Sequence, residues 1–167
     1  INQFLLLGIF LIWFIGIYNA VNLIDGLDGL AAGFMILFCI AITFISNESI
    51  SFFNINLFLS IILLSYMIYN QRPAKVFMGD SGSLFLGYYI AVLPLIHWHF
   101  NYNPSNSSLD ITPFLIVSTY LIADTTRVFF TRIFAGKSPM NADTIHLHHL
   151  VIQKSGSYLT TLFIIFL

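Results

Sequence analysis

Five long apolar segments constrain this chain more than any other feature of its sequence. They cover residues 3–18, 30–46, 52–69, 83–100 and 113–135, and a sixth begins near Ser157 and ends with the chain at Leu167. These segments are too long for core strands and do not alternate with a period of two, so we expect helices. About 20 mainly apolar residues cross a bilayer as a helix, because no backbone polar group can stay unpaired in lipid. The sequence therefore predicts an all-α integral membrane protein, a multi-span helix bundle with five full spans and a truncated sixth.

The composition supports the same conclusion. Hydrophobic residues make up 58 % of the 167 residues and charged residues only 8 %, whereas about 25 % of the residues in a soluble domain are charged. The chain has no initiator Met and no signal-peptide pattern, and its last apolar segment stops after about ten residues. We therefore expect residues 1–167 to be a single transmembrane domain that is a fragment of a longer protein.

The positions of the cationic residues predict the topology. The Lys and Arg residues are Arg72, Lys75, Arg127, Arg132, Lys137 and Lys154. All of them lie in, or within reach of, the segments that follow spans three and five, and the segments after spans two and four have none. The positive-inside rule then places three connecting segments on the cytoplasmic side, at about 19–29, 70–82 and 136–156. Each of these segments contains one polar motif.

The first motif is NAVNLIDGLDGL, residues 19–30. It places Asn19, Asn22, Asp25 and Asp28 at intervals of three, on overlapping faces of a helix end. In the simplest structural explanation, Asp28 caps the next helix and Asp25 lies in a turn. Capping explains one acid, but not four polar groups at a membrane boundary without a nearby Lys or Arg. A bound cation or a hydrogen-bonding ligand explains them better.

The second motif, NQRPAKVFMGDSGSLFLGY, contains Asp80 just before an apolar span. Helix capping by Asp80 and ligand binding are equally good explanations at this point. The two are compatible, because a helix N-terminus favours phosphate and a neighbouring carboxylate can hold magnesium. Arg72 and Lys75 add positive charge, which suits a magnesium-bound diphosphate.

The third motif, GKSPMNADTIHLHHLVIQKSGS, places His146, His148 and His149 within four residues. A structural zinc site is a weak interpretation, because such sites usually include thiolates and the only cysteine, Cys39, lies inside an apolar span. The histidines can instead donate hydrogen bonds to phosphates or relay protons near neutral pH. A solvated polar loop is the structural alternative.

One further pair of charges lies inside the fifth apolar segment. Asp124 and Arg127 have the i, i+3 spacing at which side chains of a helix can pair. Ionisable residues within a membrane often mark a functional site, and a structural ion pair between packed helices is an equally good explanation. His97 and His99 are expected to belong to an interfacial belt.

The three motifs together resemble those of the polyprenyl-phosphate N-acetylhexosamine-1-phosphate transferases, in glycosyltransferase family 4. NAVNLIDGLDGLAAG, PAKVFMGDSGSLFLGY and GKSPMNADTIHLHHL occur in the family's order, and the similarity runs over residues 19–155. The His-x-His-His form is closer to the branch of undecaprenyl-phosphate N-acetylglucosamine-1-phosphate transferases, which start O-antigen, enterobacterial common antigen and teichoic acid linkage units. The phospho-N-acetylmuramoyl-pentapeptide transferases of peptidoglycan synthesis usually have three adjacent histidines, and Leu147 interrupts that run here.

The resemblance implies a reaction, a set of partners and a location. A polyprenyl phosphate would attack the β-phosphate of a UDP-amino sugar, giving polyprenyl-diphospho-sugar and UMP. Mg²⁺, with Mn²⁺ as the alternative, would be the cofactor. The partners would be the lipid, the nucleotide sugar and the membrane, without nucleic acid, and a homodimer is left open. The location would be the bacterial inner membrane, with the active face in the cytoplasm.

The resemblance also implies residue roles. Catalytic roles would fall to Asp80, Asp25 and His148, substrate-binding roles to Asn22, Asp28, Lys75, His146 and His149, and metal binding to Asp80 with Asn22 as second ligand. Asp25 and Asp28 would lie at the nucleotide end, and the histidines would contact the diphosphate or the sugar. The identity of the sugar is not determined by these residues.

The sequence departs from the family at one point, and two other functions are compatible with its polar residues. Members of the family carry a pair of adjacent aspartates in an earlier cytoplasmic loop, and these 167 residues contain no such pair. We therefore expect the match to be to the C-terminal portion of a longer enzyme, and this chain alone to be inactive. A cation-coupled transporter would place its acids and histidines near the bilayer midplane. A non-catalytic membrane scaffold would tolerate loss of the acids.

Overall fold

Helices form the whole of the regular structure in the computed structural model, which describes residues 3–45, 50–101, 111–136, 138 and 146–166. Within these ranges there is no strand. The helices are α1 (Gln3–Ile24), α2 (Leu30–Ile45), α3 (Ile50–Asn70), α4 (Gly79–Asn101), α5 (Thr112–Val117), α6 (Thr119–Phe134), α7 (Leu147–Ser155) and α8 (Tyr158–Phe166). The all-α prediction is confirmed.

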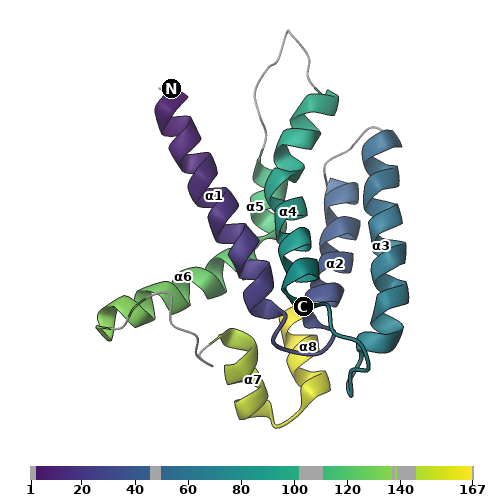
Figure 1. The fold of residues 1–167 in the computed structure, drawn as a ribbon, viewed down its shortest axis with the longest axis vertical. Helices are drawn as coiled ribbons and strands as arrows, with labels where there is room; N and C mark the ends of the chain where they lie inside the picture. Colours follow the sequence, from purple (N-terminus) through teal and green to yellow (C-terminus); the bar gives the residue numbers. More distant parts are fainter. Residues whose placement is uncertain (1–2, 46–49, 102–110, 137, 139–145, 167) are drawn as a thin grey trace.

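Two packed helix pairs form the body of the molecule. α1 lies against α4, and α2 lies against α3 (Figure 1). By length and apolar composition, three helical stretches could cross a membrane: Gln3–Ile24, Phe52–Asn70 and Gly79–His99. The stretch Leu30–Phe44 of α2 is apolar but shorter. These helices correspond to the first four predicted spans, and the chain is a membrane protein.

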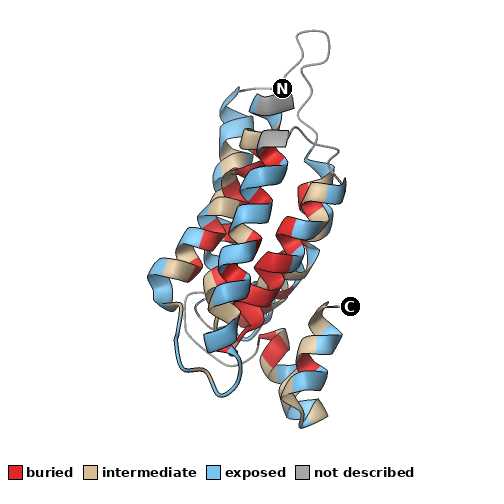
Figure 2. Ribbon diagram, turned by 90° about the vertical axis from the view of Figure 1, so that its right-hand side faces the viewer, coloured by how far each residue is buried: buried red, intermediate tan, exposed pale blue. Residues whose placement is uncertain are grey.

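The burial pattern is that of a helix bundle in lipid. Buried residues gather where the helices face one another (Figure 2), and Phe38, Met35 and Ile90 are among the fully enclosed side chains. Large apolar side chains also cover the outer surface, including Phe4 at 83 % exposure and Phe44 at 81 %. Exposed apolar patches of this extent require an apolar surrounding, which a bilayer supplies.

The segment expected to form the fifth span is not one helix. α5 ends at Val117, α6 begins at Thr119, and Ser118 between them has φ −86° and ψ 3°. α6 leaves the bundle at an angle (Figure 1). Its buried positions are Leu121, Asp124, Val128 and Arg132, which follow one another at i+3 or i+4 and form a single stripe. Two of the four are charged, so this helix needs polar partners that a straight span through lipid would not give it.

The connecting segments also differ from the expectation. The first polar motif is helical as far as Ile24, and residues expected to be loop form α7 between Leu147 and Ser155. α7 and α8 pack against each other, and α8 also contacts α2. The C-terminal end of α1, the N-terminal end of α4 and the start of α7 therefore lie near the same end of the bundle (Figure 1).

Close packing of α1 against α4 depends on one glycine. A Cβ added to Gly87 would lie 2.6 Å from the carbonyl oxygen of Tyr18, a backbone atom that cannot move aside by a change of rotamer. About one turn away on each helix, the indole N–H of Trp13 on α1 donates to the Ala91 carbonyl of α4 at 3.0 Å. Small residues at such crossings let membrane helices approach closely.

Gly87→Ala is therefore expected to separate α1 from α4 and to destabilise the fold by about 1–3 kcal/mol, the usual cost of overpacking. The measurement is the thermal unfolding midpoint in detergent. Gly8→Ala is the matched control, because nothing lies within 4 Å of a Cβ added at Gly8. Equal midpoints for the two variants would contradict the assignment of Gly87 to the helix contact.

Candidate functional site

A polar pocket of about 260 Å³ lies at the end of the bundle where the three motifs meet. Its lining residues are Asn22, Leu23, Asp25, Gly26, Asp80, Arg132, His146 and His149. They come from α1 and the turn after it, from the first turn of α4, from α6 and from the start of α7. Segments more than 120 residues apart in the sequence thus contribute to one site.

Asn22 connects the first motif to the second. Its side-chain N–H group donates to Asp80 Oδ1 at 3.1 Å and to Ser83 Oγ at 2.8 Å. Ser83 is fully buried and donates to the Gly79 carbonyl at 3.1 Å, so its oxygen is oriented to accept from Asn22. In this arrangement Asn22 orients the Asp80 carboxylate at the pocket.

Asp25 and Asp80 place two carboxylates on the same pocket. Burial raises the pKa of Asp25 from its usual 3.8 to about 6, and the negative charge of Asp80 raises it further in the same direction. The two acids therefore repel each other, and a cation between them would relieve that repulsion.

The donor set fits magnesium better than zinc. Among the described residues, no cluster of three or more His, Cys, Asp or Glu side chains is placed to hold a metal ion. Mg²⁺ usually takes only one or two protein carboxylates and completes its shell with water and substrate phosphates. Asp80 and Asp25, which both line the pocket, would supply such a partial set.

The carboxylate of Asp28 points into the loop rather than into the pocket. Its Oδ2 accepts the backbone N–H of Ala74 at 3.2 Å, and its carbonyl accepts the hydroxyl of Tyr158. The next residue, Gly29, donates its N–H to Asn70 Oδ1 at 2.9 Å, and Asn70 in turn donates to the Val76 carbonyl at 2.8 Å. These bonds tie the α1–α2 turn to the α3–α4 loop. Of the predicted site residues, Asp28, the exposed Lys75 and His148 do not line the pocket.

The histidines form a stacked row behind and beside the pocket. The rings of His146 and His148 are stacked at 5.8 Å with an interplanar angle of 15°, and those of His148 and His149 are 4.2 Å apart at 45°. A Cβ added to Gly26 would lie 3.4 Å from His148 Nε2 and 3.7 Å from His149 Nε2, so the turn after α1 packs directly on this row. The first and third motifs are thereby in contact.

His148 is enclosed and neutral. Its exposed fraction is 0 %, and neither of its ring nitrogens has a hydrogen-bond partner among the described residues. Burial, followed by the charges of His149 and His146, lowers the pKa of His148 from 6.5 to about 4. His148 does not line the pocket, whereas its neighbours His146 and His149 do.

Two residues at this site were not among the site residues predicted from the sequence. Arg132 lines the pocket, although the sequence used it only to orient the chain in the membrane. Asp124 does pair with Arg127, at 2.8 Å, but it also binds His146 Nδ1 at 2.9 Å. The i, i+4, i+8 spacing of Asp124, Val128 and Arg132 is the signal that could have placed both charges on the same helix face.

Comparison with known proteins shows the family of this chain. The sequence model of the family described as "Glycosyl transferase family 4" matches residues 1–97, which is more than half of the chain. The protein belongs to this family.

Its relatives include several sugar-phosphate transferases. The chain is 38 % identical over 159 residues to the "Probable undecaprenyl-phosphate N-acetylglucosaminyl 1-phosphate transferase" of Bacillus subtilis (strain 168), covering 93 % of this chain and 43 % of the relative. It is 29 % identical over 156 residues to the undecaprenyl-phosphate alpha-N-acetylglucosaminyl 1-phosphate transferase of Thermotoga maritima, covering 93 % and 46 %. A phospho-N-acetylmuramoyl-pentapeptide-transferase of Fervidobacterium nodosum is 44 % identical over 105 residues, covering 62 % and 32 %. The chain thus spans less than half the length of these relatives.

The lowered pKa of His148 predicts a pH-dependent stability. Between pH 6.5 and about 4 the unfolded chain binds a proton at His148 that the folded protein does not bind. The contribution of His148 to folding stability is therefore complete above pH 6.5 and is lost as the pH falls toward 4. His148→Gln is expected to show a shallower fall of the unfolding midpoint than the wild type over this window. Equal slopes for the two proteins would contradict the buried, neutral state of His148.

Proposed function

We propose that the protein transfers an N-acetylhexosamine-1-phosphate from a UDP-sugar to undecaprenyl phosphate, or another polyprenyl phosphate, and releases UMP. The observation that carries this proposal is the pocket itself. Two acids, two histidines and one arginine converge at one end of a membrane helix bundle. A nucleotide sugar can reach such a site from the water, and a lipid can reach it from the bilayer. An ion-coupled transporter would instead hold its charges near the midplane.

The transfer changes two bonds to phosphorus. A phosphate oxygen of the lipid attacks the β-phosphorus of the UDP-sugar, and the bond between that phosphorus and the bridging oxygen of the α-phosphate breaks. The products are UMP and a polyprenyl-diphospho-sugar. The negative charge on the diphosphate must be neutralised while the bonds change. Arg132 supplies a cation at the pocket wall, and His146 and His149 supply ring nitrogens.

Asp80 and Asp25 have distinct roles in this proposal. Mg²⁺ bound at Asp80, with Asn22 and Asp25 beside it, would supply a Lewis acid for the diphosphate. Asp25 is the second carboxylate at the pocket, and we assign to it the acceptance of the proton of the acceptor phosphate. His148 supports the two histidines at the pocket by stacking against both rings.

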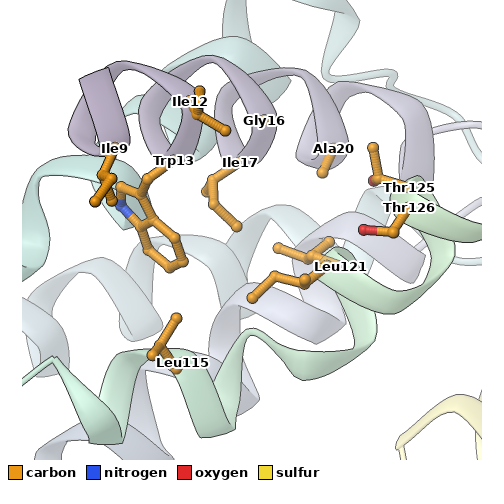
Figure 3. Close-up of a pocket in the computed structure, with 11 residues that line it drawn as sticks. Ile9, Ile12, Trp13, Gly16, Ile17, Ala20, Leu115, Leu121, Thr125 and Thr126 are labelled. Atoms are coloured by element: carbon orange, nitrogen blue, oxygen red, sulfur yellow. The ribbon is translucent and has the colours of Figure 1, made fainter. Parts of the chain in front are cut away.

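An apolar cavity of about 330 Å³ beside the polar pocket suits the lipid chain. It lies between α1 and the α5–α6 segment, where Ile12, Ile17 and Leu121 line it and Thr125 and Thr126 are at one end (Figure 3). Its α1 residues run from Ile9 to Ala20, about 16 Å along a helix. The lining of the polar pocket begins at Asn22, on the next stretch of the same helix. A chain lying along α1 would thus bring its phosphate to the acids.

The relatives favour one donor over another. N-acetylglucosamine-1-phosphate transferases align with more than nine-tenths of this chain, and the interrupted histidine run is typical of that branch. We therefore propose UDP-N-acetylglucosamine as the donor and the initiating step of a cell-envelope polysaccharide, such as a lipopolysaccharide or a wall polymer, as the role. Phospho-N-acetylmuramoyl-pentapeptide transfer is the alternative. The site would face the cytoplasm of a bacterial inner membrane.

Asp80→Ala tests the polar pocket. In membranes that carry the intact protein, this change is expected to lower UMP release by about 10²–10³-fold, because the main carboxylate for the diphosphate-bound cation is lost. Ser81→Ala is the matched control, since it removes an exposed polar group from the next residue. UMP release that is the same in Asp80→Ala as in the wild type would overturn the assignment of Asp80.

Gly16→Leu tests the apolar cavity. The added side chain would occupy space beside α1 and displace about two CH₂ groups of the lipid, at about 0.8 kcal/mol each. The KM for polyprenyl phosphate is expected to rise about tenfold, with the KM for the UDP-sugar unchanged. Gly8→Leu is the control, because Gly8 also has nothing within 4 Å of an added Cβ but lies outside the cavity lining. An equal rise of this KM in both variants would contradict the assignment of the cavity to the lipid chain.

A further inference from the structure

We infer that Asp124 is a positioning residue, which holds the His146 ring so that Nε2 alone faces the polar pocket. This inference rests on the proposed function, because it names what the site requires of one histidine. It concerns a helix, α6, that none of the three polar motifs includes.

Three hydrogen bonds converge on the Asp124 carboxylate. Oδ2 lies 2.9 Å from His146 Nδ1, and Oδ1 accepts from the Arg127 guanidinium at 2.8 Å and from the Leu147 backbone N–H at 2.8 Å. Asp124 is 4 % exposed and His146 is 3 % exposed. The buried carboxylate thus holds both the ring of His146 and the backbone at the start of α7.

The bonding pattern assigns the proton on the His146 ring. Arg127 and the Leu147 N–H are donors only, so they favour an Asp124 carboxylate whose oxygens all act as acceptors. His146 Nδ1 must then carry the hydrogen that it shares with Oδ2. In the neutral ring this leaves a lone pair on Nε2, and in the protonated ring it leaves an N–H that faces the pocket with its charge balanced by Asp124.

Nε2 of His146 is the atom left for the substrate. It is buried and has no hydrogen-bond partner among the described residues, and His146 lines the polar pocket. A buried polar atom without a partner is costly unless a ligand supplies one. The atom is therefore placed to contact the diphosphate or the sugar, while Asp124 prevents the ring from turning away.

The Asp124→Asn variant reverses this arrangement with little change of shape. Its amide oxygen matches the two donors, Arg127 and the Leu147 N–H, and its amide nitrogen then faces His146. An amide N–H donates to Nδ1, so the ring hydrogen of neutral His146 moves to Nε2. The variant keeps the packing and inverts the tautomer.

The first test is a kinetic double-mutant cycle in the intact protein. Asp124→Asn is expected to lower kcat about 10²-fold and to leave the KM for the UDP-sugar nearly unchanged. His146→Asn keeps a short donor toward Asp124 but removes the atom that reaches the pocket. In that background, Asp124→Asn is expected to cost no further activity. Equal losses in both backgrounds would overturn the inference, because Asp124 would then act without His146.

His97→Gln is the control for losing a histidine. His97 lies between Phe52 and Phe114, far from the pocket lining, and Asp124→Asn is expected to remain fully deleterious in its background. A wild type that releases no UMP from any UDP-sugar would instead defeat the proposed function.

The second test does not depend on activity. In ¹⁵N-histidine-labelled protein, the signals of His146 are assigned by their loss in His146→Asn. The wild type is expected to carry its hydrogen on Nδ1 at neutral pH, and Asp124→Asn to carry it on Nε2. Should Asp124→Asn fail to fold, Asp124→Glu retains a carboxylate and is expected to keep the Nδ1 hydrogen. A wild-type ring with its neutral hydrogen on Nε2 would overturn the inference.

Discussion

A buried carboxylate at the edge of a membrane must find donors or a cation, and this requirement organises one end of the molecule. Leaving such a group unpaired in a low-dielectric surrounding is more costly than most packing defects. Asp124, 4 % exposed, is such a carboxylate, and it is bonded to His146, Arg127 and Leu147. Asp80 is exposed and bonded to Asn22, and it lines a shared pocket with the half-buried Asp25. These bonds connect α1 to α4 and α6 to α7 around a polar space.

The same contacts explain why α6 leaves the bundle. A continuous fifth span would have surrounded Asp124 and Arg132 with lipid or with apolar neighbours. The break at Ser118 instead lets the charged stripe of α6 face the histidine segment and the pocket. The apolar cavity lies between α1 and both sides of this break, with Leu115 of α5 and Leu121 of α6 in its lining (Figure 3). One break in a helix therefore contributes to both the polar and the apolar part of the proposed site.

Much of this arrangement could be predicted from the sequence, because the length of an apolar segment and the polar motif that follows it can both be recognised locally. The helices, the convergence of Asn22, Asp25 and Asp80, and the closeness of His146 follow from that reasoning. The break at Ser118 could not be predicted from the sequence, because no Pro or Gly lies at that position and apolar residues continue on both sides of it. The orientation of the Asp28 carboxylate toward the loop was not predicted either. Its partner is the backbone N–H of Ala74, and a backbone group cannot be recognised from the type of residue that carries it.

The central claim is that the three polar segments form one diphosphate site at the membrane face. A cryo-EM map of the intact protein with a UDP-sugar and Mg²⁺ tests it most directly. The account predicts diphosphate density bordered by Asp25, Asp80 and His146, with the lipid-facing side open along α1. Density for the nucleotide sugar bordered by none of these residues, or at the opposite end of α1, would contradict it.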